Sequence, residues 1–185
     1  MIMPLEDHVC DPKNWQDRHV NDISSPAELI VSLRENAQKG WIDRATLFRI
    51  AKVKSPRRAK DVNKNPDHVV HQITQLAFDK DALTDERLRI SLLCALHGVR
   101  VPTASAILSW VFPERWPVID RRAWAALADL GYVEASRATR LTPGDWEMFC
   151  SIVIPAAKAV DWTPQKTDRW LYGYARRRDL GGTPQ

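Results

Sequence analysis

The sequence predicts an all-α fold. Apolar residues recur at helical spacing in one segment after another, and no segment alternates apolar and polar residues as a strand would. Residues that favour helix ends, chiefly Pro, Asp, Thr and Gly, separate those segments. We expect one helical domain over 25–180, preceded by an N-terminal arm without periodicity over 1–24 and followed by a loose tail over 181–185.

The clearest helix pair spans 92–112, with a glycine between its two apolar runs. Gly98 allows the positive φ that a very short helix–helix turn requires, and Pro102 suits the first turn of the second helix. Small residues follow Pro102, so a large surface can approach the backbone N–H groups that a helix start leaves unpaired. Such N–H groups favour phosphate, which indicates a site for a nucleic-acid backbone.

Six further helices are expected along the chain. Their starts are marked by Pro26, Asp43, Asn65, Asp120, Thr142 and Thr163. Gly40 and Gly131 end two of them, and Thr84 or Asp85 caps the helix that leads into the turn. Pro155 should kink or break the helix that begins at Thr142, because proline lacks the N–H that a helix needs.

Length and composition indicate one globular domain. The chain has 185 residues and a formal net charge of +4, which permits nucleic-acid binding without proving it. Its cysteines, Cys10, Cys94 and Cys150, lie far apart, which argues against a disulfide framework. No apolar run is long enough to span a bilayer, and no signal-peptide pattern is present. We expect a cytoplasmic monomer that does not contact membranes.

The motif Leu-x-x-Leu-x-Gly-Val-x-x-x-Thr-Ala-Ser at 93–105, followed by Pro-Val-Ile-Asp at 117–120, resembles the helix-hairpin-helix DNA glycosylases. The likeness is greatest to short bacterial proteins with the 8-oxoguanine DNA glycosylase fold. It implies a two-lobed helical domain with a central cleft, in which the hairpin holds the DNA backbone. It also implies that Asp120 is catalytic.

Two residues depart from the family's pattern. Arg100 replaces the second hairpin glycine, which reshapes the turn or adds a cationic phosphate contact. Pro102 stands where bifunctional members have a lysine nucleophile, so the resemblance implies no Schiff-base lyase chemistry from that position. The chain has no four-cysteine iron–sulfur motif, and His68 and His71 have no third partner for a metal. We expect no metal centre and no cofactor, leaving open only a monovalent cation at the hairpin.

Asp120 has two compatible interpretations. An Asp directly before a helix is among the commonest N-caps, a role that needs no chemistry. The hairpin upstream favours the catalytic interpretation as well, since the family's catalytic Asp is also found at a helix start. Breaking an N-glycosidic bond generates positive charge on the sugar. A fixed anion beneath the sugar stabilises that charge and orients the attacking water.

The segment 49–64 is the most cationic in the chain, with seven Lys or Arg residues against one Asp. Charge runs are usually solvated faces, so a solvated loop and a phosphate contact both stay open here. The hairpin and this segment together supply the expected DNA contacts, which are Gly98, Val99, Arg100, Thr103, Lys54 and Arg57.

The chain has eight tryptophans, and three of them are candidates for the pocket of an extruded base: Trp116, Trp41 and Trp170. Trp116 ranks first for stacking on the base, because it lies in the loop just before Asp120. A core role is favoured for those on apolar helix faces, which are Trp110, Trp124, Trp146 and also Trp170.

These features predict a monofunctional DNA glycosylase that flips out a modified base, excises it and leaves an abasic site. The leading target is a hypermodified cytosine of phage DNA, such as glucosylated hydroxymethylcytosine, in a role of antiviral defence. Repair of oxidised or alkylated bases is the alternative. The competing classes are a helix-hairpin-helix module that only binds DNA and a helical protein-interaction domain.

Overall fold

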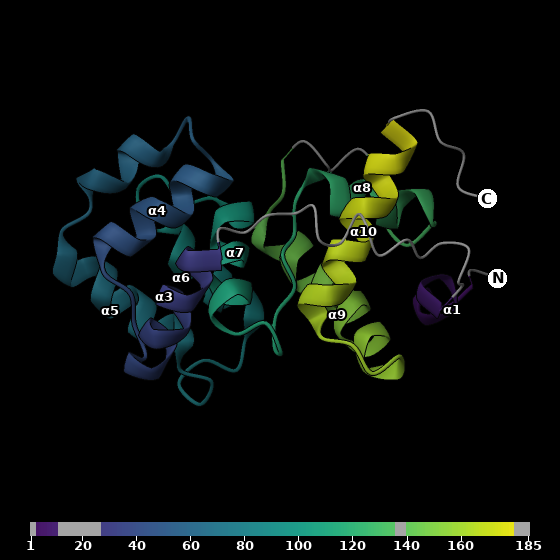
Figure 1. The fold of residues 1–185 in the computed structure, drawn as a ribbon, viewed down its shortest axis with the longest axis horizontal. Helices are drawn as coiled ribbons and strands as arrows, with labels where there is room; N and C mark the ends of the chain where they lie inside the picture. Colours follow the sequence, from purple (N-terminus) through teal and green to yellow (C-terminus); the bar gives the residue numbers. More distant parts are fainter. Residues whose placement is uncertain (1–2, 11–26, 136–139, 180–185) are drawn as a thin grey trace.

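The computed structural model describes residues 3–10, 27–135 and 140–179. All regular elements in these ranges are helices and no strand occurs among them, which confirms the predicted all-α class. In chain order they are α1 (Leu5–Cys10), α3 (Ala27–Lys39), α4 (Arg44–Lys54), the 3-10 helix η2 (Ala59–Lys64), α5 (Asp67–Phe78), α6 (Glu86–Cys94), α7 (Val101–Val111), α8 (Arg121–Asp129), α9 (Pro143–Ala159) and α10 (Pro164–Asp179). Figure 1 shows α3 to α7 gathered at one end of the molecule, and α8, α9, α10 and α1 at the other.

The central helix is α7. It packs against α3, α4, α6 and α9, so it joins the two groups of helices seen in Figure 1. Its side chains from Thr103 to Val111 are all buried, and its apolar residues belong to one core cluster that includes residues of both groups. The predicted hairpin thus leads into the most buried helix, and the loop 112–120 crosses from α7 to α8.

Side chains at the predicted helix starts cap their helices. Asp43, Asp85 and Asp120 each accept a hydrogen bond from the backbone N–H two or three residues later, and Thr142 forms a capping box. Asp85, and not Thr84, is therefore the cap of α6. Each cap contributes about 1 kcal/mol to stability. The cap at Asp120 also fixes where α8 begins, and so where that carboxylate stands.

Part of the expected arm is helical. Leu5 and Val9 of α1 are buried, and α1 packs against α9. The segment is too short for periodicity to reveal it, because α1 has only six residues. Residues 1–2 and 11–24 of the arm, the expected helix start at Pro26 and the tail 181–185 lie outside the described residues.

The helix α9 runs through Pro155 without a break, so of the two expected effects of this proline, a kink or a break, the break does not occur. Pro155 and Ser151 are both exposed, so water can reach the Ser151 carbonyl that the proline leaves unpaired. On α6, Leu88 is 53% exposed although it lies at helical spacing from Leu92, whereas Arg89 beside it is 2% exposed. Arg89 is buried because its guanidinium donates to backbone carbonyls in and after α5, including that of Asp79.

Candidate active site

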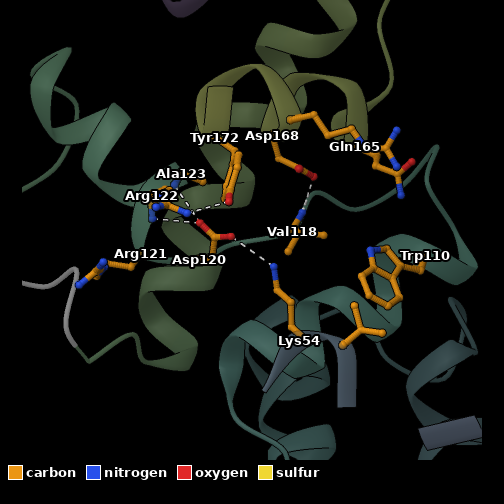
Figure 2. Close-up of a pocket in the computed structure, with 12 residues that line it drawn as sticks. Lys54, Trp110, Val118, Asp120, Arg121, Arg122, Ala123, Gln165, Asp168 and Tyr172 are labelled. Atoms are coloured by element: carbon orange, nitrogen blue, oxygen red, sulfur yellow. Dashed lines mark hydrogen bonds and ion pairs between the residues drawn. The ribbon is translucent and has the colours of Figure 1, made fainter. Parts of the chain in front are cut away.

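A cavity of about 400 Å³ opens beside the N-terminal end of α8 (Figure 2). Its wall takes side chains from α4, α7, α8 and α10 and from the loop before α8: Val53, Lys54, Trp110, Val118, Asp120, Arg121, Arg122, Ala123, Gln165, Asp168, Arg169 and Tyr172. Two carboxyl groups and four cationic side chains are among them. The volume lies within the range of small-molecule sites.

Asp120 lies on the cavity wall and caps α8 at the same time. Its Oδ1 accepts hydrogen bonds from the backbone N–H groups of Arg122 and Ala123, both at 3.0 Å. Its Oδ2 lies 3.2 Å from the Nζ of Lys54 (Figure 2). The Asp120 side chain is 22% exposed. One carboxylate oxygen is therefore anchored by the backbone, and the other has only a flexible side chain as its partner.

Side chains from two other helices hold the loop that leads to Asp120. The Oγ of Ser105, on α7, accepts a hydrogen bond from the Ile119 N–H at 3.2 Å. The Oδ2 of Asp168, on α10, accepts one from the Val118 N–H at 2.5 Å. The two residues directly before Asp120 are thus fixed, so α7 and α10 position this carboxylate together with α8.

The hairpin turn packs against η2 with no space for a side chain. Gly98 has a φ of +81°, and a Cβ there would lie 2.9 Å from the Arg58 carbonyl oxygen and from the Val62 backbone nitrogen. Asn65 is buried beside the turn, where its Oδ1 accepts from the His97 N–H at 2.8 Å and its Nδ2 donates to the His97 carbonyl at 3.0 Å. The sequence indicated only a helix start at Asn65. No local pattern signals its two hydrogen bonds to His97.

The hairpin offers some of the expected DNA contacts and hides others. The N–H groups of Gly98, Arg100 and Val101 make no hydrogen bond to any residue that the structure describes, and the Arg100 side chain is exposed. Val99 and Thr103 are buried, and their N–H groups are bonded within the turn. A phosphate could therefore reach the N–H groups of Gly98, Arg100 and Val101. Val99 and Thr103 serve the packing of the hairpin instead.

The two cations expected from the cationic segment lie in different settings. Arg57 follows α4 and is exposed. Lys54 is the last residue of α4 and lines the cavity, with its side chain 19% exposed and its Nζ on Asp120. The ion pair joins residues 66 positions apart, so no local spacing in the sequence could have indicated it.

The three tryptophans proposed for the base pocket do not line this cavity. Trp116 is buried with the Arg89 guanidinium 5.0 Å from its ring centre. Trp41 stacks on His71 with ring centres 4.1 Å apart. Trp170 is buried in the core cluster. Segment ends suggested exposure for the first two, but the loop before Asp120 and the segment before α4 both fold back onto neighbouring helices.

Two other aromatic residues line the cavity. Trp110 reaches it from α7 although only 6% of the residue is exposed. Tyr172 reaches it from α10, and its hydroxyl accepts a hydrogen bond from Nη1 of Arg122 at 2.7 Å (Figure 2). These rings, rather than the expected tryptophans, are the aromatic surfaces that a ligand in the cavity would meet.

One face of α10 supplies a polar wall. Gln165, Asp168 and Tyr172 lie at positions i, i+3 and i+7, and all three line the cavity. Burial raises the pKa of Asp168 well above its usual range, and the nearby Val118 N–H, Lys54 and Arg169 lower it only in part. Sequence reasoning missed this wall because it followed the apolar face of the same helix. The i, i+3, i+7 polar pattern was the available signal.

Residues 3–10, 27–135 and 140–179 include no group of three or more His, Cys, Asp or Glu side chains placed to hold a metal ion. His71 packs on Trp41, and His68 is exposed. None of the helices described has both the length and the apolar character that crossing a membrane requires.

Comparison with known protein families, with curated proteins and with solved structures gives no match for this chain. The resemblance to helix-hairpin-helix glycosylases therefore depends on the motif residues themselves and on the geometry that surrounds them.

Proposed function

We propose that this chain is a monofunctional DNA glycosylase that extrudes a modified base, breaks its N-glycosidic bond and leaves an abasic site. One observation carries the proposal: the Asp120 carboxylate is anchored by two backbone N–H groups at the wall of a cavity of about 400 Å³. A carboxylate that served only as an N-cap would not need to face such a space. The geometry therefore supports chemistry in addition to capping.

The proposed mechanism depends on the fixed charge of Asp120. As the C1′–N bond lengthens, its electron pair moves to the base and the sugar becomes an oxocarbenium-like cation. The anchored carboxylate stabilises this cation because its orientation is set before the reaction begins. Its outer oxygen also orients a water molecule, which attacks C1′ and loses a proton to Asp120 and then to solvent.

Lys54 has to change partner in this mechanism. Its ammonium lies 3.2 Å from Asp120 Oδ2, where it would repel a sugar cation. Bound DNA brings phosphates to the cavity mouth, and charge-assisted bonds to phosphate are strong. We expect Lys54 to turn from Asp120 to a phosphate when the duplex binds, which frees Oδ2 for the sugar and the water.

The hairpin supplies the proposed grip on DNA. Three free N–H groups, those of Gly98, Arg100 and Val101, suit one phosphate, and the exposed Arg100 and Arg57 side chains suit its neighbours. The two groups of helices joined by α7 would act as the two lobes of the glycosylase architecture, with the cavity as the cleft between them. The extruded nucleotide would enter that cleft, since the bond to be broken is hidden in the duplex.

A hypermodified cytosine, such as glucosylated hydroxymethylcytosine of phage DNA, is the leading target, which would make the role antiviral defence. The cavity of about 400 Å³ leaves room beside an ordinary base, and the Trp110 and Tyr172 rings offer the apolar faces that sugars bind. Repair of oxidised or alkylated bases is the alternative, which the same Asp120 chemistry would serve.

A module that only holds DNA is the competing function. It would use the same hairpin N–H groups, but it has no use for a cavity beside Asp120. That cavity therefore favours the enzyme.

The absence of lyase chemistry is part of the proposal. Position 102 is Pro, and the Lys54 ammonium in its ion pair has no free electron pair with which to attack C1′. Sodium borohydride added with a duplex that carries an abasic aldehyde should leave no covalent protein–DNA complex. A trapped complex that disappears in Lys54→Gln would mean that Lys54 is a nucleophile, and the monofunctional proposal would be wrong.

The central experiment measures released bases by mass spectrometry. Duplexes that contain glucosylated hydroxymethylcytosine, oxidised bases or alkylated bases are incubated with the protein, and release from one class is expected. Asp120→Asn should abolish release and keep duplex affinity within a few fold. Asp85→Asn is the matched control, because it makes the same change at the N-cap of α6. Unchanged release by Asp120→Asn would leave only the DNA-binding module.

A further inference from the structure

Asp168 is the second carboxyl group of the cavity, and the mechanism above does not use it. It is 6% exposed and lines the cavity from α10. Its Oδ2 accepts the Val118 N–H at 2.5 Å, and its Oδ1 makes no hydrogen bond to any residue that the structure describes. The second oxygen is therefore left to whatever occupies the cavity that Asp168 lines.

The surroundings of Asp168 favour its protonated form. Three charged groups face it: Lys54 from α4 and Arg169 from α10 favour ionisation, and Asp120 opposes it. Burial outweighs them and raises the pKa well above the usual range of an Asp. The acid therefore has a hydrogen to donate from Oδ1, the oxygen that the protein leaves unpaired.

Gln165 stands one helical turn before Asp168 on the same face of α10. Its Nε2 donates to the Ser109 carbonyl at 3.2 Å, which fixes the orientation of the amide. Its Oε1 makes no hydrogen bond to a described residue and is free to accept one. The face of α10 thus carries a donor at Asp168 and an acceptor at Gln165 in the cavity that Asp120 also lines (Figure 2).

We propose that Asp168 is the proton donor to the departing base and that Gln165 accepts a hydrogen bond from an amino group of that base. The inference rests on the proposed glycosylase function, since it needs a sugar on Asp120 and a base directed at α10. Cytosine, adenine and guanine each carry a ring acceptor next to an exocyclic amino group, whereas thymine and uracil carry no amino group. The substrate class is therefore a modified amino-bearing base, and the leading cytosine target belongs to it.

The proton balance is complete. When the C1′–N bond breaks, its electron pair goes to the base, and the proton of Asp168 goes to an acceptor atom of the base, such as a ring nitrogen. Water supplies the hydroxyl group that bonds to C1′, and its proton passes through Asp120 to solvent. After the base departs, Asp168 takes a proton from solvent and the site is restored. No oxidant, metal or further reactant is needed.

The test uses single-turnover release from two sets of duplexes. One set carries amino-bearing bases, including glucosylated hydroxymethylcytosine and alkylated adenine. The other carries bases without an exocyclic amino group, including uracil and oxidised thymine. Asp168→Asn keeps an oxygen for the Val118 N–H but removes the acid. Asp145→Asn is the matched control, since it alters another buried Asp in the cap of α9.

We expect the wild-type protein to release an amino-bearing base, and Asp168→Asn to slow release by about 10²–10⁴-fold. Its affinity for a duplex with a tetrahydrofuran abasic analogue should be unchanged, and Asp145→Asn should release normally. The wild-type rate should fall at high pH, where Asp168 ionises, and the slow rate of Asp168→Asn should lack that fall.

Four outcomes would overturn the inference. Asp168→Asn could release the base at the wild-type rate, or lose duplex affinity in proportion to rate, in which case Asp168 only holds the loop. The wild-type protein could release only bases without an exocyclic amino group, which would refute the pairing with Gln165 while leaving the glycosylase function intact. Release of no base by the wild-type protein would instead refute the glycosylase function, and the role of Asp168 with it.

Discussion

The two carboxyl groups of the cavity, Asp120 and Asp168, face the same space from opposite surroundings. Asp120 stands at a helix start, with two backbone N–H groups on one oxygen and a lysine on the other. Asp168 stands within α10, 6% exposed, with one N–H group on one oxygen. The first carboxyl group has hydrogen-bond donors or a cation at both oxygens, whereas burial raises the pKa of the second and favours its protonated form.

This difference separates two tasks that N-glycosidic cleavage requires. A permanent anion suits the sugar, which becomes positive, and a proton suits the base, which leaves with an electron pair. Two identical side chains can serve both tasks only if their environments hold them in different states. Asp120→Asn should therefore remove a negative charge from the cavity, whereas Asp168→Asn should remove a proton donor. The predictions below use that contrast.

The largest effect is expected at Asp120, on the binding of a cationic sugar analogue. A duplex with a pyrrolidine abasic analogue, which is protonated and mimics the sugar cation, should bind more tightly than one with tetrahydrofuran, by about 10²-fold or more. Asp120→Asn should abolish that preference, because the amide is neutral, and Asp85→Asn should keep it. Competition binding measures both ratios. An undiminished preference in Asp120→Asn would assign the anion to another residue.

Asp120 could be predicted from the sequence because its signals are local. The N-cap, the loop length and the hairpin motif all lie within 93–123. The contacts that complete the site are not local. Lys54 meets Asp120 across 66 residues, and Asp168 meets Val118 across 50. Such pairs depend on how helices pack, and helical periodicity in one segment carries no information about them.

The same lack of information about helix packing explains why the tryptophans expected in the base pocket do not line the cavity. Position in the chain suggested that Trp116 is exposed, but the loop 112–120 folds back and buries it near Arg89. Trp110 was expected in the core and is indeed buried, yet its edge reaches the cavity. Apolar spacing predicts burial well for a helix such as α7. It cannot predict which buried ring borders a space that only the tertiary structure creates.

Gly98→Ala tests the packing of the hairpin turn against η2 and the residue before it. Gly98→Ala combines an unfavourable positive φ with a Cβ 2.9 Å from two backbone atoms of η2. We expect a loss of about 1–3 kcal/mol in the free energy of unfolding and weaker duplex binding. Gly40→Ala is the matched control, because its φ is +78° and no atom lies within 4 Å of the place that an alanine methyl group would take. Chemical denaturation of both variants separates strain from contact, and equal losses would mean that the packing on η2 contributes nothing.

Asp168→Asn should stabilise the protein, and more so as pH rises. Burial raises the pKa of Asp168 in the folded state, so the native protein keeps a proton that the unfolded chain loses above about pH 3.9. As the pH rises from about 3.9 to the folded-state pKa of Asp168, the free energy of unfolding therefore falls by about 1.4 kcal/mol per pH unit. Asparagine removes this loss. Its gain in Tm over the wild type should grow by about 3–6 °C per unit in that window.

Asp79→Asn provides a control of opposite sign for the same measurement. The N–H groups of Ala82 and Asp81 lower the pKa of Asp79, so its carboxylate stabilises the fold above the unfolded-state pKa and loses that effect in acid. Asp79→Asn should therefore be less stable than the wild type at neutral pH. The two proteins should become equally stable once the pH falls below the folded-state pKa of Asp79. Thermal melts from about pH 2 to pH 8 compare Asp168→Asn and Asp79→Asn with the wild type. A gain in Asp168→Asn that does not change with pH would mean that Asp168 is ionised in the fold.

The smallest effect is expected outside the cavity, at Arg57. If this exposed side chain contacts one phosphate, Arg57→Gln should weaken duplex binding several fold and reduce the slope of log affinity against log salt by about 1. Release of a bound base should keep its rate, because Arg57 touches neither carboxyl group. Lys158→Gln, an exposed cation at the end of α9, is the control and should leave the slope unchanged. If Arg57→Gln and Lys158→Gln gave the same slope of log affinity against log salt, the segment 49–64 would be a solvated face without a phosphate contact. DNA binding would then depend on the hairpin N–H groups and Arg100.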